Sequence, residues 1–176
     1  CIRDRGIGVV ETPGHAAHHV SFLHEDTLFV GEAAGTFQDL GEGRWYLRPA
    51  TPPCFKLEVA VSSLDRLLAL NPEPERLAFA HHGQLVGHSR ELLKLAREQL
   101  KQWVTAVGLV LEQDTLQPFE ELARQVVARL RATDRNFALG RALPADIRIR
   151  EEDFTQQTLR GMVQYVEEIR DHGGRR

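Results

Sequence analysis

Residues 7–33 read IGVVETPGHAAHHVSFLHEDTLFVGEA, and the spacing of apolar residues in this stretch decides the expected fold. Residues 7–11 form a β-prone run that ends at the turn-favouring residues 12–14. Residues 19–24 alternate between two faces, two acidic residues follow, and residues 27–31 again place apolar side chains at every second position. The pattern therefore predicts a strand, a histidine-rich turn and then a β-hairpin.

The first half of the chain continues with one helix and one more strand. Ser62 and Asp65 form a capping-box pattern, which predicts that a helix begins there and runs to Leu70, just before a proline. Residues 77–80 are predicted to be a short strand that leads directly into residues 81–83, His-His-Gly.

The second half has the apolar periodicity of helices. Ser89 is predicted to cap the first of them, and residues 116–130 carry the apolar face of the second. A third helix is predicted to begin near Asp153, where Gln156 completes a capping box. Residues 135–150 carry mixed signals and are predicted to form a connector. We expect the apolar stripes of these helices to form a core or an interface.

Composition limits the classes of protein that this chain can represent. It has 176 residues, of which 42% are hydrophobic and 27% charged, and a formal net charge of -3, which is typical of a globular protein and implies no nucleic-acid partner. No apolar stretch is long enough to cross a bilayer and no secretory leader is visible, so we expect a cytoplasmic protein without membrane attachment. Because the chain begins with Cys1 instead of Met, we expect it to be a fragment or a processed product.

Histidine is the residue type most able to carry chemistry here. Cys1 and Cys54 are too few for a disulfide framework and are not spaced as a metal-binding pair. Seven of the eight histidines precede residue 89. The two parts of the chain, residues 1–88 and 89–176, are therefore expected to do different jobs.

Three motifs resemble one known family. The runs TPGHAAHHVSF at residues 12–22 and TLFVGEA at residues 27–33 resemble the TPGHTPGHISF and TLFVGDA signature of the metallo-β-lactamase superfamily. The run LAFAHHG at residues 77–83 resembles that family's terminal strand, which ends in PGHG or SHFG. The resemblance covers about residues 7–88 and implies an α/β (α+β) fold, in which we expect residues 1–88 to form the C-terminal half of a metallo-β-lactamase fold. This fold would be half of an αββα sandwich, followed at residues 89–176 by a helical C-terminal extension.

The resemblance also implies a metal site. His15 matches a histidine ligand of the family, Glu32 its bridging carboxylate and His82 its last histidine ligand, so Glu32 and His82 are the expected catalytic residues. His19 matches a second histidine that is usually structural, and His81 is expected on the substrate side or as a filler residue. Such ligands suit two divalent ions, Zn first with Fe or Mn as alternatives, which activate water near neutral pH.

Two departures from the family pattern limit what the chain can do alone. The bridging position normally holds Asp, whereas Glu32 is one methylene longer. The HxHxDH motif, which supplies the family's remaining ligands, has no counterpart in these residues. We therefore expect the site to be incomplete in this chain.

Two functions remain open from the sequence. The first is a metal-dependent hydrolase that acts on an ester, thioester, lactone or related small molecule. The second is a non-catalytic assembly module, in which the helical extension binds a partner or a second copy of the chain as a homodimer, while the metal site is partial or decayed.

Overall fold

The computed structural model describes residues 2–4, 6–114 and 116–173. Within them the strands are β1 (Ile2–Asp4), β2 (Ile7–Glu11), β3 (Val20–His24), β4 (Thr27–Gly31), β5 (Thr36–Asp39), β6 (Trp45–Arg48), β7 (Arg76–Phe79) and β8 (Gln84–Val86). The helices are α1 (Leu57–Leu68), α2 (Ser89–Gln113), α3 (Phe119–Thr133), α4 (Arg135–Ala138), the 3-10 turn η1 (Leu139–Ala142) and α5 (Ala145–Gly173). This mixed α/β architecture confirms the predicted fold class.

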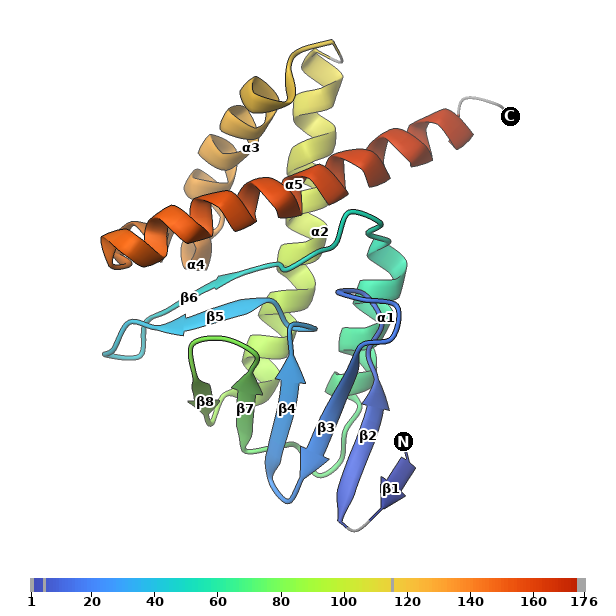
Figure 1. The fold of residues 1–176 in the computed structure, drawn as a ribbon, viewed down its shortest axis with the longest axis vertical. Coiled ribbons are helices and arrows are strands. Elements are labelled where there is room, and N and C mark those ends of the chain that lie inside the picture. Colours follow the sequence, from blue (N-terminus) through green and yellow to red (C-terminus); the bar gives the residue numbers. More distant parts are fainter. Residues whose placement is uncertain (1, 5, 115, 174–176) are drawn as a thin grey trace.

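The described strands form one large mixed sheet and a separate two-stranded ribbon. The large sheet has the order β1-β2-β3-β4-β7-β8, and β5 pairs with β6 (Figure 1). The β3–β4 hairpin pairs Phe22 with Phe29, which confirms the predicted hairpin. All neighbouring strands of the sheet are antiparallel except β4 and β7, which run parallel. Both strands therefore end, at Gly31 and Phe79, on the same edge of the large sheet.

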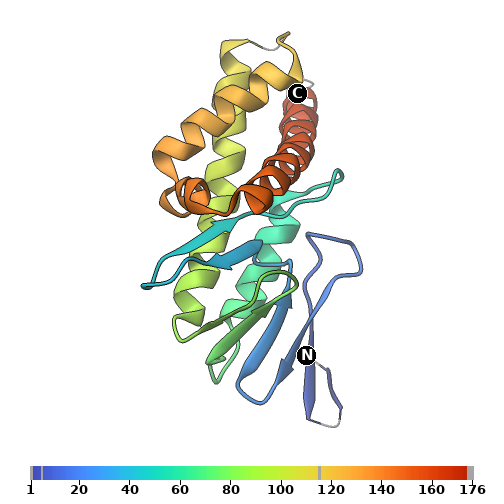
Figure 2. The ribbon, with the colours of Figure 1, turned by 60° about the vertical axis from the view of Figure 1, so that its left-hand side comes forward.

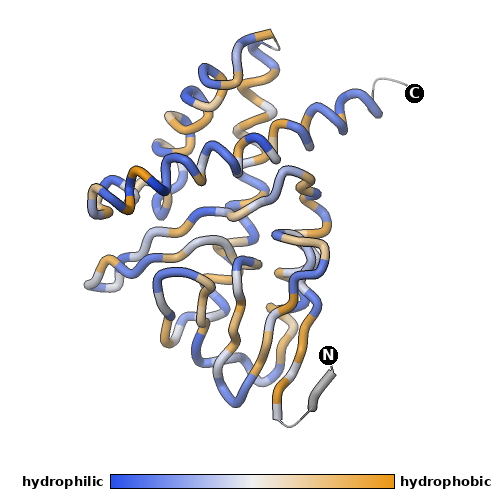
Figure 3. Tube along the Cα trace, viewed as in Figure 1, coloured by the Kyte–Doolittle hydropathy of each residue, from blue (hydrophilic) through white to orange (hydrophobic). Residues whose placement is uncertain are grey.

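Helices α1 and α2 cover one face of the large sheet (Figure 2). The side chains that point toward them are almost fully buried: Val10, Leu28, Val30 and Leu77. Figure 3 shows hydrophobic segments along β2, β3 and β4, as expected for strands with a buried face.

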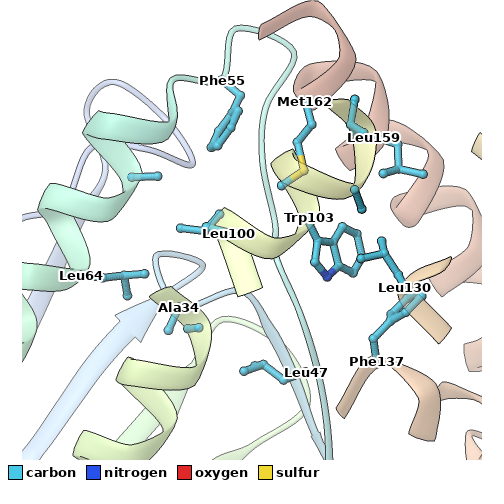
Figure 4. Close-up of a cluster of buried hydrophobic side chains, with 14 of the residues drawn as sticks. Ala34, Leu47, Phe55, Leu64, Leu100, Trp103, Leu130, Phe137, Leu159 and Met162 are labelled. Carbon is cyan, nitrogen blue, oxygen red and sulfur yellow. The ribbon is translucent and has the colours of Figure 1, made fainter. Parts of the chain in front are cut away.

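Helix α2 extends beyond the sheet and is shared by the two halves of the chain. Its residues Leu100 and Trp103 lie between Leu64 of α1 and Met162 of α5 in one hydrophobic cluster (Figure 4). Asp134 accepts hydrogen bonds from the Trp103 indole and the Gln99 amide of this helix, at 2.9 and 2.8 Å. A division of the chain at residue 88 stays a prediction, since α2 packs against both halves.

Helix starts are where the structure departs from the sequence predictions. The helix expected to begin at Ser62 begins at Leu57, because the apolar face continues backward through the buried Ala60. Ser62 and Asp65 therefore lie inside α1 and form no cap. The prediction of Ser89 as a cap was also wrong: the capping position is His88, in the left-handed conformation, and the buried Ser89 hydroxyl has no partner among the described residues.

The predicted connector at residues 135–150 was wrong as well. Residues 135–138 form α4, whose start is capped by the Asp134 carboxylate accepting a hydrogen bond from the Phe137 amide. Helix α5 begins at Ala145, directly after a proline, so the expected start at Asp153 lies inside it. Leu116 does not belong to α3 and is 93% exposed. Asp153 and Gln156 have the spacing of a capping box although both lie inside α5.

Helix α5 is fastened to the segment that follows β6. The Thr51 hydroxyl donates to the Thr158 carbonyl oxygen at 3.2 Å, and the Thr158 hydroxyl donates to the Pro49 carbonyl oxygen at 3.4 Å. A side chain at Gly161 would place its Cβ 2.2 Å from the Pro52 carbonyl oxygen. The close packing of α5 therefore depends on a glycine at position 161. The buried Arg48 guanidinium also donates to the buried Glu151 carboxylate of this helix.

Two glycines in helices test this packing. Gly161→Ala is expected to lower the free energy of unfolding by about 1–3 kcal/mol, because the new methyl group overlaps backbone that cannot easily move. Gly108→Ala in α2, where a Cβ meets nothing within 4 Å, is expected to raise it by about 0.5–1 kcal/mol. Urea denaturation of both variants measures these changes. Stabilisation by both substitutions would contradict the contact between α5 and Pro52.

Candidate functional site

Three turns meet at one edge of the large sheet and carry the histidines singled out from the sequence. The turn between β2 and β3 holds His15 and His19, Glu32 directly follows β4, and His81 and His82 directly follow β7. Because β4 and β7 are parallel, the residues that follow them lie side by side, and the Ala80 amide donates to the Gly31 carbonyl oxygen at 3.2 Å.

Glu32 is the residue on which the site converges. Its Oε2 lies 2.9 Å from Nε2 of His15, and its Oε1 lies 3.6 Å from Nε2 of His81. The Glu32 side chain is only 26% exposed, so its charge is partly shielded from water. One carboxylate thus faces two imidazoles that come from turns far apart in the sequence.

The protonation of His15 follows from its two partners. Its Nδ1 lies 3.1 Å from the Ala50 carbonyl oxygen, which can only accept, so Nδ1 carries a proton. The Nε2 atom that faces Glu32 therefore holds either a second proton or a lone pair available to a cation. The hydrogen bond to Glu32 raises the pKa of His15 above 6.5, although partial burial opposes this. The same hydrogen bond lowers the pKa of Glu32, again against the effect of burial.

His19 has a different environment, and its hydrogen bonds have a definite direction. The Glu32 backbone amide donates to Nε2 of His19 at 3.3 Å, so the proton of a neutral ring sits on Nδ1 and is donated to the Thr12 hydroxyl at 2.9 Å. Thr12 can then donate to Ser21 at 2.9 Å, and Ser21 donates to the Val30 carbonyl oxygen at 3.3 Å. Burial lowers the pKa of His19, which agrees with a neutral ring.

This chain of hydrogen bonds, called here the His19 relay, leaves no room beside Gly31. A Cβ at Gly31 would lie 2.5 Å from Nε2 of His19, and the φ angle of Gly31 is +60°. A glycine at this position is therefore needed for His19 to approach the Glu32 amide. In this geometry His19 holds the backbone of Glu32 through the hydrogen bond to its amide.

The two histidines after β7 occupy different positions. His81 approaches the Glu32 carboxylate, whereas His82 has a φ angle of +64° and its ring centroid lies 6.1 Å from that of His81. Both line the same cleft of about 340 Å³ as His15 and Glu32. Among the described residues, the ion pairs of Glu32 are with His15 and His81, and none is with His82. The roles expected for His15, Glu32, His82, His19 and His81 stay predictions.

The wall of the cleft opposite the sheet is formed by α5. Arg150, Phe154 and Thr158 line it, together with Arg48 at the end of β6. Sequence reasoning did not find these residues, because the contact brings together positions about a hundred residues apart. The local apolar periodicity of α5 carries no signal for which of its polar residues face a cleft.

The donor atoms fit a divalent cation in chemical type but do not make a complete ligand set. Imidazole nitrogen and carboxylate oxygen are the ligands that Zn²⁺ accepts. Among the described residues, however, no group of three or more His, Cys, Asp or Glu side chains is arranged to hold a metal ion.

The described helices include none that is both long and apolar enough to cross a membrane.

Comparison with known proteins identifies the class to which this fold and these motifs belong. The chain is 34% identical over 106 residues to the metallo-β-lactamase fold-containing protein ST1585 of Sulfurisphaera tokodaii, a match that covers 60% of this chain and 36% of that protein. No family model matches the chain. The crystal structure of the metallo-β-lactamase family protein TTHA1429 from Thermus thermophilus matches 92% of this chain and 44% of its own length, with 22% identity and a TM-score of 0.53.

The chain is related in sequence to part of ST1585, a metallo-β-lactamase fold-containing protein, and it shares the fold of part of TTHA1429. It spans about a third of ST1585 and less than half of TTHA1429. The resemblance of the histidine motifs to this superfamily is thereby confirmed.

The opposite pKa shifts of His15 and His19 can be measured in the metal-free chain. His15 is expected to titrate above pH 6.5, because Glu32 favours its charged form, and His19 below pH 6.5, because burial disfavours its charged form. The raised pKa of His15 contributes stability that is fully present below pH 6.5. This stability is lost as the pH rises through the pKa of His15 in the folded chain. The lowered pKa of His19 removes stability as pH falls below 6.5.

Because these contributions oppose each other, the resonances must be followed individually by NMR. Glu32→Gln is expected to lower the pKa of His15. The pKa of His15 should stay above that of His19, with the difference between the two unchanged or smaller. An His19 resonance that titrates above that of His15 in the unsubstituted chain would contradict the hydrogen-bond directions assigned here.

Proposed function

We propose that this chain carries part of the active site of a metal-dependent hydrolase. The observation that supports the proposal most is the convergence of His15 and His81 on the two oxygens of Glu32, in a cleft also lined by His82. The proposed ligands are His15, Glu32 and His82, for two divalent ions with Zn first and Fe or Mn as alternatives. His81, which lies closer to Glu32, is the alternative to His82 as a ligand.

The residues of the chain have distinct tasks in this proposal. Ala50 holds the proton of His15 on Nδ1, which leaves Nε2 directed at the cleft. The His19 relay orients the backbone of Glu32 and so aims its carboxylate. A bound divalent ion would supply the acidity that converts water into hydroxide near neutral pH. Orienting contacts of this kind are typical of metal sites, in which ligands are themselves hydrogen-bonded.

The substrate class in this proposal is an ester, thioester, lactone or related small molecule. The cleft volume of about 340 Å³ falls within the range of small-molecule sites. The exposed Arg150 and Phe154 on α5 are placed to contact the substrate outside the ligand set. The chain covers only a third of the length of ST1585, so the remaining ligands and the activity of the whole protein are part of the proposal.

Zinc titration of the chain by isothermal calorimetry tests the ligand set. His15→Ala and Glu32→Ala are expected to abolish measurable binding, because each removes a proposed ligand. His19→Ala is expected to weaken binding by about tenfold to a hundredfold, because it removes a contact that orients a ligand. His24→Ala, an exposed histidine at the far end of the β3–β4 hairpin, is the matched control and should bind zinc unchanged.

Parallel substitution of His81 and His82 separates their roles. Loss of zinc binding in His82→Ala with retention in His81→Ala supports the assignment above, and the reverse result transfers the ligand role to His81. Equal zinc affinity of all five site variants and the His24→Ala control would contradict a metal site in this cleft. Hydrolysis of an ester, a thioester and a lactone by the complete metal-loaded protein then identifies the substrate class.

A second candidate function, self-assembly, is favoured by the sheet face opposite α1 and α2. Val9, Phe22, Phe29 and Ala78 form a cross-strand row on that face. Phe22 and Phe29 are 43% and 48% exposed, and the nearby Ile7 is 42% exposed. A run of exposed apolar residues across neighbouring strands is typical of a surface that another layer covers. We propose a second copy of the chain as the covering layer when the chain is alone.

Sedimentation velocity tests this assembly. The chain is expected to form a concentration-dependent dimer, and Phe22→Ser combined with Phe29→Ser is expected to make it monomeric by removing apolar surface. Leu116→Ser, which changes a 93% exposed side chain away from the sheet, should dimerise like the unsubstituted chain. A monomer at every concentration would rule out this assembly.

A further inference from the structure

A second cavity lies on the other side of Glu151 from the histidine cleft. It has a volume of about 360 Å³ and is enclosed by α3, the α4–η1 segment, the first turns of α5 and Tyr46 of β6. None of the histidines of the candidate metal site lines it. Its volume falls within the range of cavities that bind small molecules. The cavity is therefore a separate candidate site.

The rim of this cavity is strongly basic. Four exposed arginines line it: Arg124 and Arg131 of α3, Arg141 of η1 and Arg148 of α5. They give the cavity the excess of positive charge that attracts an anion. Because guanidinium groups bind carboxylate and phosphate oxygens through paired hydrogen bonds, arginines suit an anionic group better than lysines would.

Acidic residues neutralise only part of this charge. Arg124 is paired with Glu121 at 2.6 Å, and Arg131 lies 4.0 Å from Glu152. For Arg141 and Arg148, no carboxylate lies within 4.0 Å in the part of the chain that the structure describes. These two arginines are free to bind an external anion.

The other lining carboxylate, Glu151, is already committed. It is buried and accepts hydrogen bonds from the Arg48 guanidinium and, at 2.9 Å, from the Tyr46 hydroxyl. Its charge is therefore balanced from the side of the histidine cleft. Glu151 does not cancel the charge of the arginines at the rim.

The wall beneath the arginines is apolar. Tyr46, Phe137 and Leu143 are buried side chains that line the cavity, and Val127 and Ala128 of α3 complete this wall. Tyr46 and Phe137 lie with their ring centroids 6.2 Å apart. An aromatic and aliphatic wall beside a basic rim matches a ligand that has an apolar body and one anionic group.

We propose that this cavity binds a small organic anion, with a phosphate or carboxylate group held by Arg141 and Arg148 and an apolar body against Tyr46 and Phe137. The site is independent of the metal site in its residues. It is connected to the histidine cleft through Tyr46 and Glu151, because Glu151 also holds Arg48, which lines that cleft.

Isothermal titration of the folded chain with four probes tests the proposal. Phenyl phosphate and benzoate supply an apolar ring with a phosphate or a carboxylate, benzyl alcohol supplies the ring without charge, and inorganic phosphate supplies the charge without a ring. At least one of the two aromatic anions is expected to bind more tightly than both of the others, and comparison of the two identifies the preferred anionic group. Equal or tighter binding of benzyl alcohol or inorganic phosphate would overturn the proposal, as would failure of both aromatic anions to bind.

A pair of matched double variants locates the binding. Arg141→Gln with Arg148→Gln is expected to weaken binding of the preferred anion by about tenfold to a hundredfold, because two charged hydrogen-bond donors are removed. Arg129→Gln with Arg135→Gln removes the same charge from exposed positions that do not line the cavity, and should leave the affinity unchanged. Circular dichroism confirms that both variants are folded. Equal loss of affinity in the two variants would show a general charge effect and overturn the assignment of the cavity.

Discussion

The His19 relay is the interaction on which the geometry of the candidate site depends. It joins the turn after β2 to the end of β4, since His19 accepts a hydrogen bond from the Glu32 amide. The other ring nitrogen of His19 is hydrogen-bonded to Thr12, which is in turn hydrogen-bonded to Ser21. All of these groups are buried or half-buried, so each would lose a hydrogen bond if one partner were removed. The relay therefore aligns the His15 turn and the Glu32 turn before any ligand is present.

The helical part of the chain is connected to this site by backbone as well as by side chains. The segment after β6 supplies the Ala50 carbonyl oxygen that orients His15, and the same segment is fastened to α5 through Thr51 and Thr158. A displacement of α5 would therefore also displace a contact of His15. This coupling explains how a helix far along the sequence forms one wall of the cleft.

Local patterns in the sequence predicted the parts of the fold that depend on local forces. The alternation of apolar residues and the short acidic turn predicted the β3–β4 hairpin, and the structure pairs these two strands antiparallel. Helix starts were less predictable, because Ser62 with Asp65 has the spacing of a cap although both residues lie inside α1. Only tertiary packing of the preceding turn on the sheet distinguishes the two cases.

The candidate site was predictable in its residues but not in its geometry. Motif resemblance singled out His15, Glu32 and the histidine pair, and these residues line one cleft. It did not indicate that His81 would approach Glu32, because that contact depends on the parallel pairing of β4 with β7. The wall formed by α5 and the second, basic cavity depend on long-range packing, for which the sequence contains no local signal.

The central claim is that Glu32 and the imidazoles around it form part of a metal site. Anomalous X-ray scattering at the zinc edge, from crystals of the chain soaked in zinc, tests it most directly. We predict an anomalous peak in the cleft within coordination distance, about 2.0–2.2 Å, of a Glu32 oxygen and Nε2 of His15. Zinc bound only at other surface residues, with the hydrogen bond between His15 and Glu32 intact, would contradict the claim.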